Sequence, residues 1–198
     1  MGTLQIPSWT GLTIPERFNP GYVTNCNILG ILGSENVLCY PTAMNNALIA
    51  SMQQSDGRYL SDAELRPLAQ FVASFESRFK TYTRIKDEGE GLVKAALRQL
   101  MTTEHRLVIQ EHGGKCQRDM LYTLECIAKA ILLDNPDGFI EEYVMWMQNI
   151  TRALHKESSA IDAYRSLQTE ITAALPQEAA QLINGYLDKL ITAFAEGM

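Results

Sequence analysis

Residues 44–198 contain almost nothing that would interrupt a helix. Only three of the chain's seven prolines lie there, and of these only Pro67 falls inside a run that we expect to be helical. Apolar residues recur at spacings of three and four, the period of an amphipathic helix, and no useful length of strand-like alternation is visible. The pattern predicts an all-α domain of six or seven helices with short connections, packed as a globin-like or bundle architecture.

Residues 1–43 have a different composition. They hold four of the prolines, five of the thirteen glycines and only three charged side chains, Glu16, Arg17 and Glu35. Apolar stretches such as residues 28–32 favour an arm docked on a surface over a solvated tail. We therefore divide the chain into an irregular N-terminal extension, 1–43, and a helical domain, 44–198. The extension either follows the domain's own surface or binds a partner.

Charge and cysteine content exclude several classes of protein. With 17 basic and 23 acidic residues the net charge is −6, which disfavours nucleic acid as a partner. No apolar run approaches a membrane span, and no secretory signal is evident. Hydrolase and nucleotide-binding motifs are absent, so we do not expect an enzyme. The four cysteines suit neither a metal knuckle nor a disulfide framework, and a reducing, cytoplasm-like compartment is expected: Cys26, Cys39, Cys116 and Cys126.

Helix boundaries follow from periodicity and capping residues. Ser61 and Glu64 form a capping box, and a stripe of apolar residues between Leu65 and Phe79 predicts a buried face. The pattern breaks between His105 and Gly114, and residues 135–138 have the composition of a turn. The expected helices are residues 42–53, a helix entered at the capping box, 83–103, 116–133, 139–155, 158–174 and 176–195.

One segment combines reactive and charged side chains. On a helix starting near Cys116, the side chains of Arg118, Asp119 and Tyr122 lie on one side, and Cys116 adjoins Asp119 one turn back. The amides of a helix N-terminus and the adjacent Lys115 favour a thiolate, which makes Cys116 the best candidate nucleophile among the cysteines. Spacing alone leaves open a purely structural role for this set.

The Cys-x-Arg-Asp run of Cys116, Arg118 and Asp119, followed by Tyr122, resembles the chromophore-attachment segment of phycobiliproteins. These are the light-harvesting subunits of cyanobacterial and red-algal phycobilisomes. Further segments resemble the family in the same order, and together they span about residues 44–194, whereas the first 43 residues have no match. These further segments are residues 57–65, 84–96, 132–134 and 183–191.

The resemblance implies a globin-like α fold with an extra N-terminal helical pair, and a bilin of the phycocyanobilin type joined by a thioether to Cys116. Arg118 would pair with a propionate through its planar fork. Asp119 would accept hydrogen bonds from pyrrole N–H groups, and Tyr122 would pack against the pigment. The implied function is light harvesting or energy transfer.

The family association also implies partners. Phycobiliproteins pair through their first helices, so we expect a dimer, either with itself or with another phycobiliprotein-like subunit. A bilin lyase is a further expected partner, and the implied location is the cytoplasm, at the thylakoid surface through the phycobilisome. The apolar residues expected to form the pairing surface are Met44, Leu48, Ile49, Met52 and Tyr59.

Some features depart from the family pattern and keep alternatives open. The approach to Cys116 is short, and Glu125 stands where the family carries a cation. These departures and the extension favour a pigment-free or transiently pigment-binding phycobilisome-associated protein for assembly or regulation. A bilin lyase or a haem-binding globin is disfavoured, because we expect His105 and His112 in a loop and His155 at a helix end.

Overall fold

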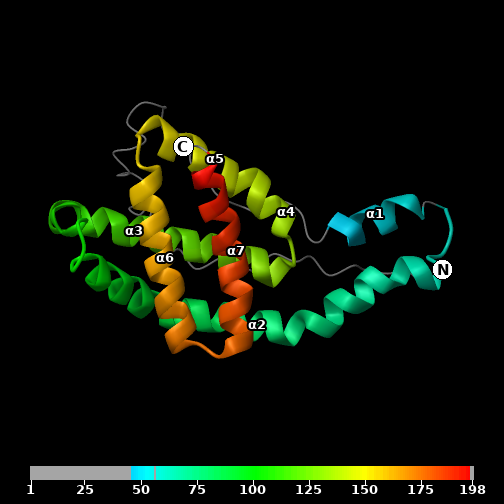
Figure 1. Cartoon of the computed structure of the whole chain (residues 1–198). Coiled ribbons are helices and arrows are strands. Elements are labelled where there is room, and N and C mark those ends of the chain that lie inside the picture. Colours follow the sequence, from blue (N-terminus) through cyan, green and yellow to red (C-terminus); the bar gives the residue numbers. More distant parts are fainter. Residues whose placement is uncertain (1–45, 56, 197–198) are drawn as a thin grey trace, which may run out of the picture. The chain divides into compact units, whose positions relative to one another are not determined.

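The computed structural model describes residues 46–55 and 57–196, and within these ranges it contains helices and no strands. The all-α prediction is therefore confirmed for this part of the chain, while the extension predicted at residues 1–43 lies outside it. The helices, drawn in Figure 1, are α1 (Asn46–Gln54), α2 (Asp62–Leu100), α3 (Arg106–Leu133), α4 (Pro136–Gly138), the π-helix η2 (Phe139–Val144), α5 (Met145–Ala153), α6 (Glu157–Ala174) and α7 (Gln177–Ala195).

Helix α2 runs unbroken for 39 residues, so the prediction of a separate helix beginning at residue 83 was wrong. It begins as the capping box predicts: the Glu64 carboxylate accepts a hydrogen bond from the Ser61 amide at 2.8 Å and pairs with Arg58 at 2.6 Å. No glycine or proline lies between Phe79 and Thr83 to end the helix. Helix α1 packs against α2, and the two form the expected N-terminal helical pair.

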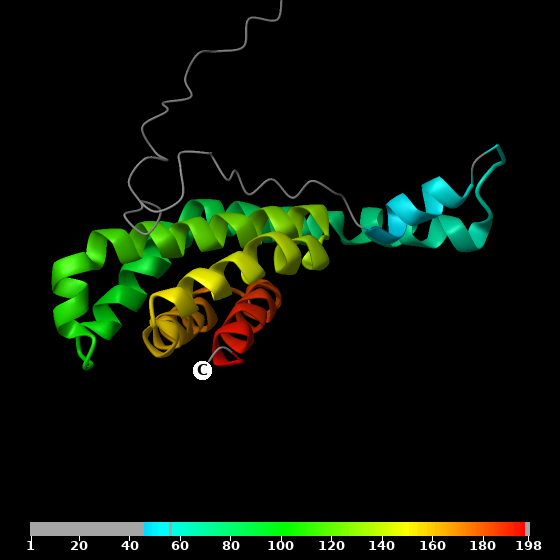
Figure 2. The same cartoon turned by 90° about the horizontal axis from the view of Figure 1, so that it is seen from above.

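The second half of α2 packs along α3, as Figure 2 shows. A buried arginine fixes this pairing near the end of α3. The Arg78 guanidinium donates hydrogen bonds to the backbone carbonyls of Leu132 and Ile131, and it lies 4.2 Å from the centre of the Phe71 ring. Because the last carbonyls of a helix lack a helical N–H partner, Arg78 supplies a donor to the Leu132 carbonyl in the last turn of α3.

The chain turns sharply after α3 and continues as α4, η2 and α5. The Asn135 side chain accepts a hydrogen bond from the Gly138 amide at 3.0 Å and caps the short α4 helix. A side chain at Gly138 would be impossible without movement, because a Cβ there would lie 2.3 Å from Asn135 Nδ2. The predicted turn at residues 135–138 is thus a tight helical start, and the predicted helix from Phe139 follows with a π-helical first part.

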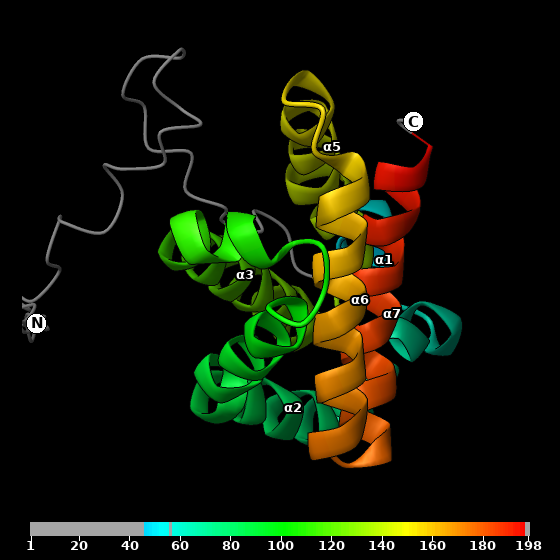
Figure 3. The ribbon, with the colours of Figure 1, turned by 60° about the vertical axis from the view of Figure 1, so that its left-hand side comes forward.

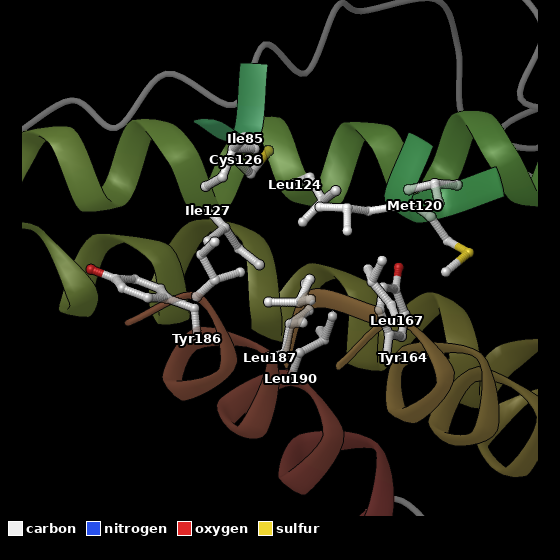
Figure 4. Packing of buried hydrophobic residues seen from close by; sticks show 14 of the residues in the cluster. Ile85, Met120, Leu124, Cys126, Ile127, Tyr164, Leu167, Tyr186, Leu187 and Leu190 are labelled. Atoms are coloured by element: carbon white, nitrogen blue, oxygen red, sulfur yellow. The ribbon is translucent and has the colours of Figure 1, made fainter. Parts of the chain in front are cut away.

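Helices α6 and α7 lie side by side as an antiparallel hairpin (Figures 1 and 3). Their observed bounds agree with the predicted ones to within one residue. Figure 4 shows how this hairpin closes the core, with Leu167 and Leu187 facing Leu124 and Ile127 of α3. All four of these side chains are 2% exposed or less, so the hydrophobic core lies between α2, α3 and the hairpin.

The apolar stripe at the start of α2 is exposed, which corrects the prediction that it is buried. Among the described residues, the buried side chains of α2 begin at Arg78 and are concentrated in its second half, so the stripe lies largely outside the core. Despite this apolar surface, none of the helices described is both long and apolar enough to span a membrane. The exposed stripe consists of Leu65, Leu68, Val72, Phe75 and Phe79, with exposures from 39% to 64%.

Candidate functional site

The four residues predicted to form the site lie on α3. Cys116, Asp119 and Tyr122 are each half-buried and follow one another at intervals of three residues, about one helical turn. They therefore form a row along the flank of α3 that borders the core. Arg118 is exposed and lies farther from the core than Asp119. The structure thus places three of the side chains together and the guanidinium at the solvent edge.

Cys116 is not at a helix N-terminus. Helix α3 begins at Arg106, so the predicted break at residues 105–114 was wrong and Cys116 lies about three turns inside the helix. Burial and the Asp119 carboxylate, in that order, raise the pKa of the Cys116 thiol. The predicted thiolate is therefore corrected: at neutral pH this cysteine is a protonated thiol. Neither Cys116 nor the buried Cys126 takes part in a disulfide.

One of the three histidines differs from its predicted position. His105 lies in the connection that precedes α3, as predicted, and is the N-cap residue of that helix, whereas His112 lies inside α3 and not in a loop. His155 follows α5 in a left-handed conformation with φ of 51°, close to the predicted helix end. His112 and His155 are exposed, and His105 Nε2 lies 2.9 Å from Asp162 Oδ2.

A cluster of aromatic rings on η2 and α5 extends from Tyr122. The centre of the Tyr122 ring lies 5.9 Å from that of Tyr143 in an edge-to-face arrangement. Tyr143 stacks on Phe139 at 5.4 Å, and its centroid is 6.1 Å from that of Trp146. The π-helical turn carries Tyr143 into this position, and such turns are frequent at functional sites.

Three buried hydroxyl groups lie directly behind the row of site residues. Thr123 Oγ1 is 2.6 Å from the Tyr143 hydroxyl and 2.7 Å from the Tyr164 hydroxyl, and it donates to the Asp119 backbone carbonyl at 3.0 Å. The three side chains are at most 4% exposed and come from α3, η2 and α6. Figure 4 shows Tyr164 extending from α6 toward the part of the core that Met120 enters.

Burial is the main cause that raises the pKa of both tyrosines well above the ordinary value of a phenol. The Asp119 carboxylate also raises the pKa of Tyr164, so its charge acts on this hydroxyl cluster as well as on Cys116. No local sequence pattern indicates that Thr123, Tyr143 or Tyr164 belongs to the site.

Glu125, which departs from the family pattern, does not add a charge to the row of site residues. It is exposed and its carboxylate forms an ion pair with Lys129 at 2.8 Å, one turn farther along α3. The acidic substitution is therefore balanced locally at the surface.

The sequence of this chain is similar to those of known proteins. Residues 48–194 match the phycobilisome protein family. The chain is 26% identical over 147 residues to allophycocyanin subunit alpha 1 of Nostoc sp., covering 70% of this chain and 91% of that protein. It is 27% identical over 149 residues to the allophycocyanin alpha chain of Mastigocladus laminosus, covering 71% and 93%. The corresponding chain of Cyanophora paradoxa is 24% identical over 147 residues, covering 70% and 91%.

The match includes α2 to α6 in full and nearly all of α7, and it contains the four candidate site residues on α3. The architecture described above is the all-α, globin-like fold with an N-terminal helical pair that the resemblance implied. On this evidence the chain belongs to the phycobilisome protein family.

Proposed function

We propose that this protein is a bilin-carrying, light-harvesting or energy-transfer subunit without enzymatic activity. In this proposal an open-chain tetrapyrrole of the phycocyanobilin type is attached by a thioether at Cys116. The observation that carries the proposal is the row of Cys116, Asp119 and Tyr122 on one flank of α3, within the residues that match the family. When bound, the pigment would supply visible absorption and an excited state that can be passed on.

The side chains suit an elongated, partly apolar ligand with acidic arms. Tyr122 and the rings beyond it offer an apolar aromatic surface, while Asp119 offers acceptors for N–H groups. The exposed Arg118 guanidinium is free to turn toward a propionate at the solvent edge and bind it through two parallel hydrogen bonds. The three groups therefore divide the recognition between the ring system and its carboxylates.

Attachment at Cys116 is an addition that requires neither oxidant nor leaving group. The sulfur would bond to one carbon of an exocyclic C=C of ring A, and the hydrogen of the thiol would be recovered as a C–H bond at the other carbon of that double bond. Because burial and Asp119 keep the thiol protonated at neutral pH, the step needs a base to remove its proton. This requirement supports a bilin lyase as the partner that completes attachment.

Coexpression with a bilin-synthesis pathway and a lyase tests the proposal. The wild-type protein should become coloured and give zinc-enhanced fluorescence on a denaturing gel, and Cys116→Ala should be colourless. Cys126→Ala is the matched control, because Cys126 lies on the same helix but is fully buried in the core, and it should remain coloured. A colourless wild type with several lyases would favour the alternative, a pigment-free or transiently pigment-binding assembly or regulatory protein.

Asp119→Asn probes the contact with the pigment separately from its attachment. If Asp119 accepts hydrogen bonds from the pyrroles, removing its charge should shift or broaden the visible absorption while covalent attachment is retained. An unchanged spectrum would show that this carboxylate does not contact the ring system.

The exposed stripe on α2 supports a subunit partner. Its five apolar side chains repeat at intervals of three and four residues, which is the pattern of a helix that packs against another helix. We propose that a second phycobiliprotein-like subunit, or a second copy of this chain, covers it. Val72→Glu should shift the sedimentation of the assembly toward the monomer, whereas Gln70→Glu, an exposed polar position nearby, should not.

A further inference from the structure

We propose that Glu104, His105 and Asp162 form a binding site for a divalent metal ion, with Zn²⁺ as the ion that fits it best. Each residue offers one ligand atom, and the three atoms lie within 4.8 Å of one another. They come from two parts of the fold, the connection between α2 and α3 and the start of α6. A bound ion would therefore join these two segments.

Two of the ligands, His105 and Asp162, are already held in place. The backbone of His105 is fixed at the start of α3, because its amide donates to Thr103 Oγ1 at 3.2 Å and its carbonyl accepts from the Ile109 amide at 3.0 Å. Its imidazole is only 18% exposed, and Nε2 lies 2.9 Å from Asp162 Oδ2. Asp162 is in the second turn of α6 and His105 directly precedes α3, so both backbones are anchored by helices and little order is lost on binding.

The third ligand and the opening to solvent allow an ion to enter. Glu104 is exposed at the surface, and the Asp162 side chain is 42% exposed, so water reaches the carboxylates. Zn²⁺ binds imidazole nitrogen and carboxylate oxygen at about 2.0–2.2 Å, which places the atoms of a tetrahedral set roughly 3.3 Å apart. The separation between His105 and Asp162 need open by only a few tenths of an ångström, while Glu104 turns inward.

The chemistry of the three groups is balanced for a divalent ion. Two carboxylates offset its two positive charges, and the imidazole, in the neutral tautomer that carries its proton on Nδ1, supplies the Nε2 lone pair. Water completes the fourth position of a tetrahedral site. The same oxygens and nitrogen would accept Mn²⁺ with lower affinity, whereas Mg²⁺ and Ca²⁺ prefer sites composed of oxygen alone.

The chain contains a matched control for this site. His112 lies 3.6 Å from Glu111 on the exposed surface of α3, but this pair has no third ligand from another element among the described residues. If a histidine beside a carboxylate were sufficient, both pairs would bind the ion equally.

Calorimetric titration of the metal-free, full-length protein with Zn²⁺ tests the proposal. His105→Ala and Asp162→Asn should each weaken binding at least tenfold, Glu104→Gln should weaken it less, and His112→Ala should change it less than twofold. Glu104→Gln alters an exposed side chain, so it keeps the test valid if His105→Ala fails to fold. Mn²⁺ and Mg²⁺ titrations should give weaker binding in that order.

Cysteine thiols are also good ligands for Zn²⁺, so a spectrum that distinguishes sulfur ligands from nitrogen and oxygen ligands is needed. The Co²⁺-loaded protein should show a visible band without the intense near-ultraviolet band of sulfur-to-cobalt charge transfer. The proposal is wrong if the wild type binds Zn²⁺ no more tightly than His105→Ala, which would leave His105 and Asp162 as a hydrogen-bonded pair only. Strong sulfur charge transfer in the wild type would also overturn it.

Discussion

Replacing Thr123 by valine should remove the polar link that joins α3, η2 and α6. Valine keeps the shape of the side chain but loses its hydroxyl. That hydroxyl has one hydrogen, donated to the Asp119 carbonyl, and it accepts from Tyr143 and Tyr164 at 2.6 and 2.7 Å. The substitution therefore breaks three hydrogen bonds in a site where Thr123 is 0% exposed and water cannot replace them.

The loss of unfolding free energy depends on how the hydroxyls of Tyr143 and Tyr164 are satisfied once the threonine hydroxyl is gone. The two phenols can turn toward each other, but two hydroxyls offer two donors, and at least one is left without an acceptor. A buried donor left without an acceptor costs about 1–3 kcal/mol. A hydrogen bond that is lost without leaving a buried group unsatisfied costs about 1 kcal/mol. Thr123→Val should therefore destabilise the protein by about 2–4 kcal/mol. Thr123→Ser keeps the hydroxyl and should cost about 1 kcal/mol for the lost methyl group.

Urea unfolding of the pigment-free protein measures both changes, provided that the slope of the transition is the same in all variants. A triple variant, Thr123→Val with Tyr143→Phe and Tyr164→Phe, removes the stranded hydroxyls and should be more stable than Thr123→Val alone. A valine variant no less stable than the serine variant would contradict the loss of three hydrogen bonds. So would a triple variant in which the two tyrosine substitutions add their cost to that of valine.

Four further outcomes are expected. Gly114→Ala should stabilise α3 by about 1 kcal/mol in thermal unfolding, because a Cβ there meets nothing within 4 Å; destabilisation would contradict a continuous helix. Gly138→Ala should displace the Asn135 cap and cost at least about 1 kcal/mol in the same assay. Alkylation of Cys116 should accelerate only at pH values above those of an ordinary cysteine, and Asp119→Asn should shift that profile to lower pH; overlapping profiles would exclude the charge effect. Burial raises the pKa of Tyr186 to about 12, so its contribution to stability should be complete below about pH 10 and fall as the pH rises toward 12, a loss that Tyr186→Phe should abolish in alkaline denaturation.

The helices that sequence predicts best are those with distinct ends. Pro176 separates α6 from α7, and both match their predicted bounds to within one residue. Helix α2 was divided in the prediction because its apolar residues change sides after Phe79. The first half presents them to solvent or a partner, and the second half, from Ile85, presents them to the core. The spacing of apolar residues reveals an apolar face, but it does not reveal that a single helix can carry two apolar faces on different sides.

Helix α3 shows how packing overrides local preference. The break in the apolar pattern between His105 and Gly114 suggested a helix start near Cys116, and Gly113 and Gly114 each cost about 1 kcal/mol in a helix relative to alanine. The helix continues through them and is anchored in the core from Met120 onward, with Ile109 and Cys116 packed partly against that core. The incorrect start made Cys116 look like a helix-terminal thiolate, and the error in charge state followed directly from the error in the boundary.

The candidate site was predictable only along one helix. Cys116, Asp119 and Tyr122 are three residues apart, so helical geometry alone brings them together. Tyr143 and Tyr164 lie 20 and 41 residues beyond Thr123, and nothing in their local sequence shows that their hydroxyls meet. Such a cluster depends on how three helices cross, which is a property of the packed fold.

The continuity of α2 links assembly to folding. At about 1.5 Å per residue its 39 residues extend roughly 58 Å, from the exposed stripe near Leu65 to core residues such as Leu100. A partner that covers the stripe binds only the folded helix, so association draws the folding equilibrium toward the native state by mass action. The melting temperature should then rise with protein concentration, and a subunit made without its partner should be degraded faster in the cell than one that is paired.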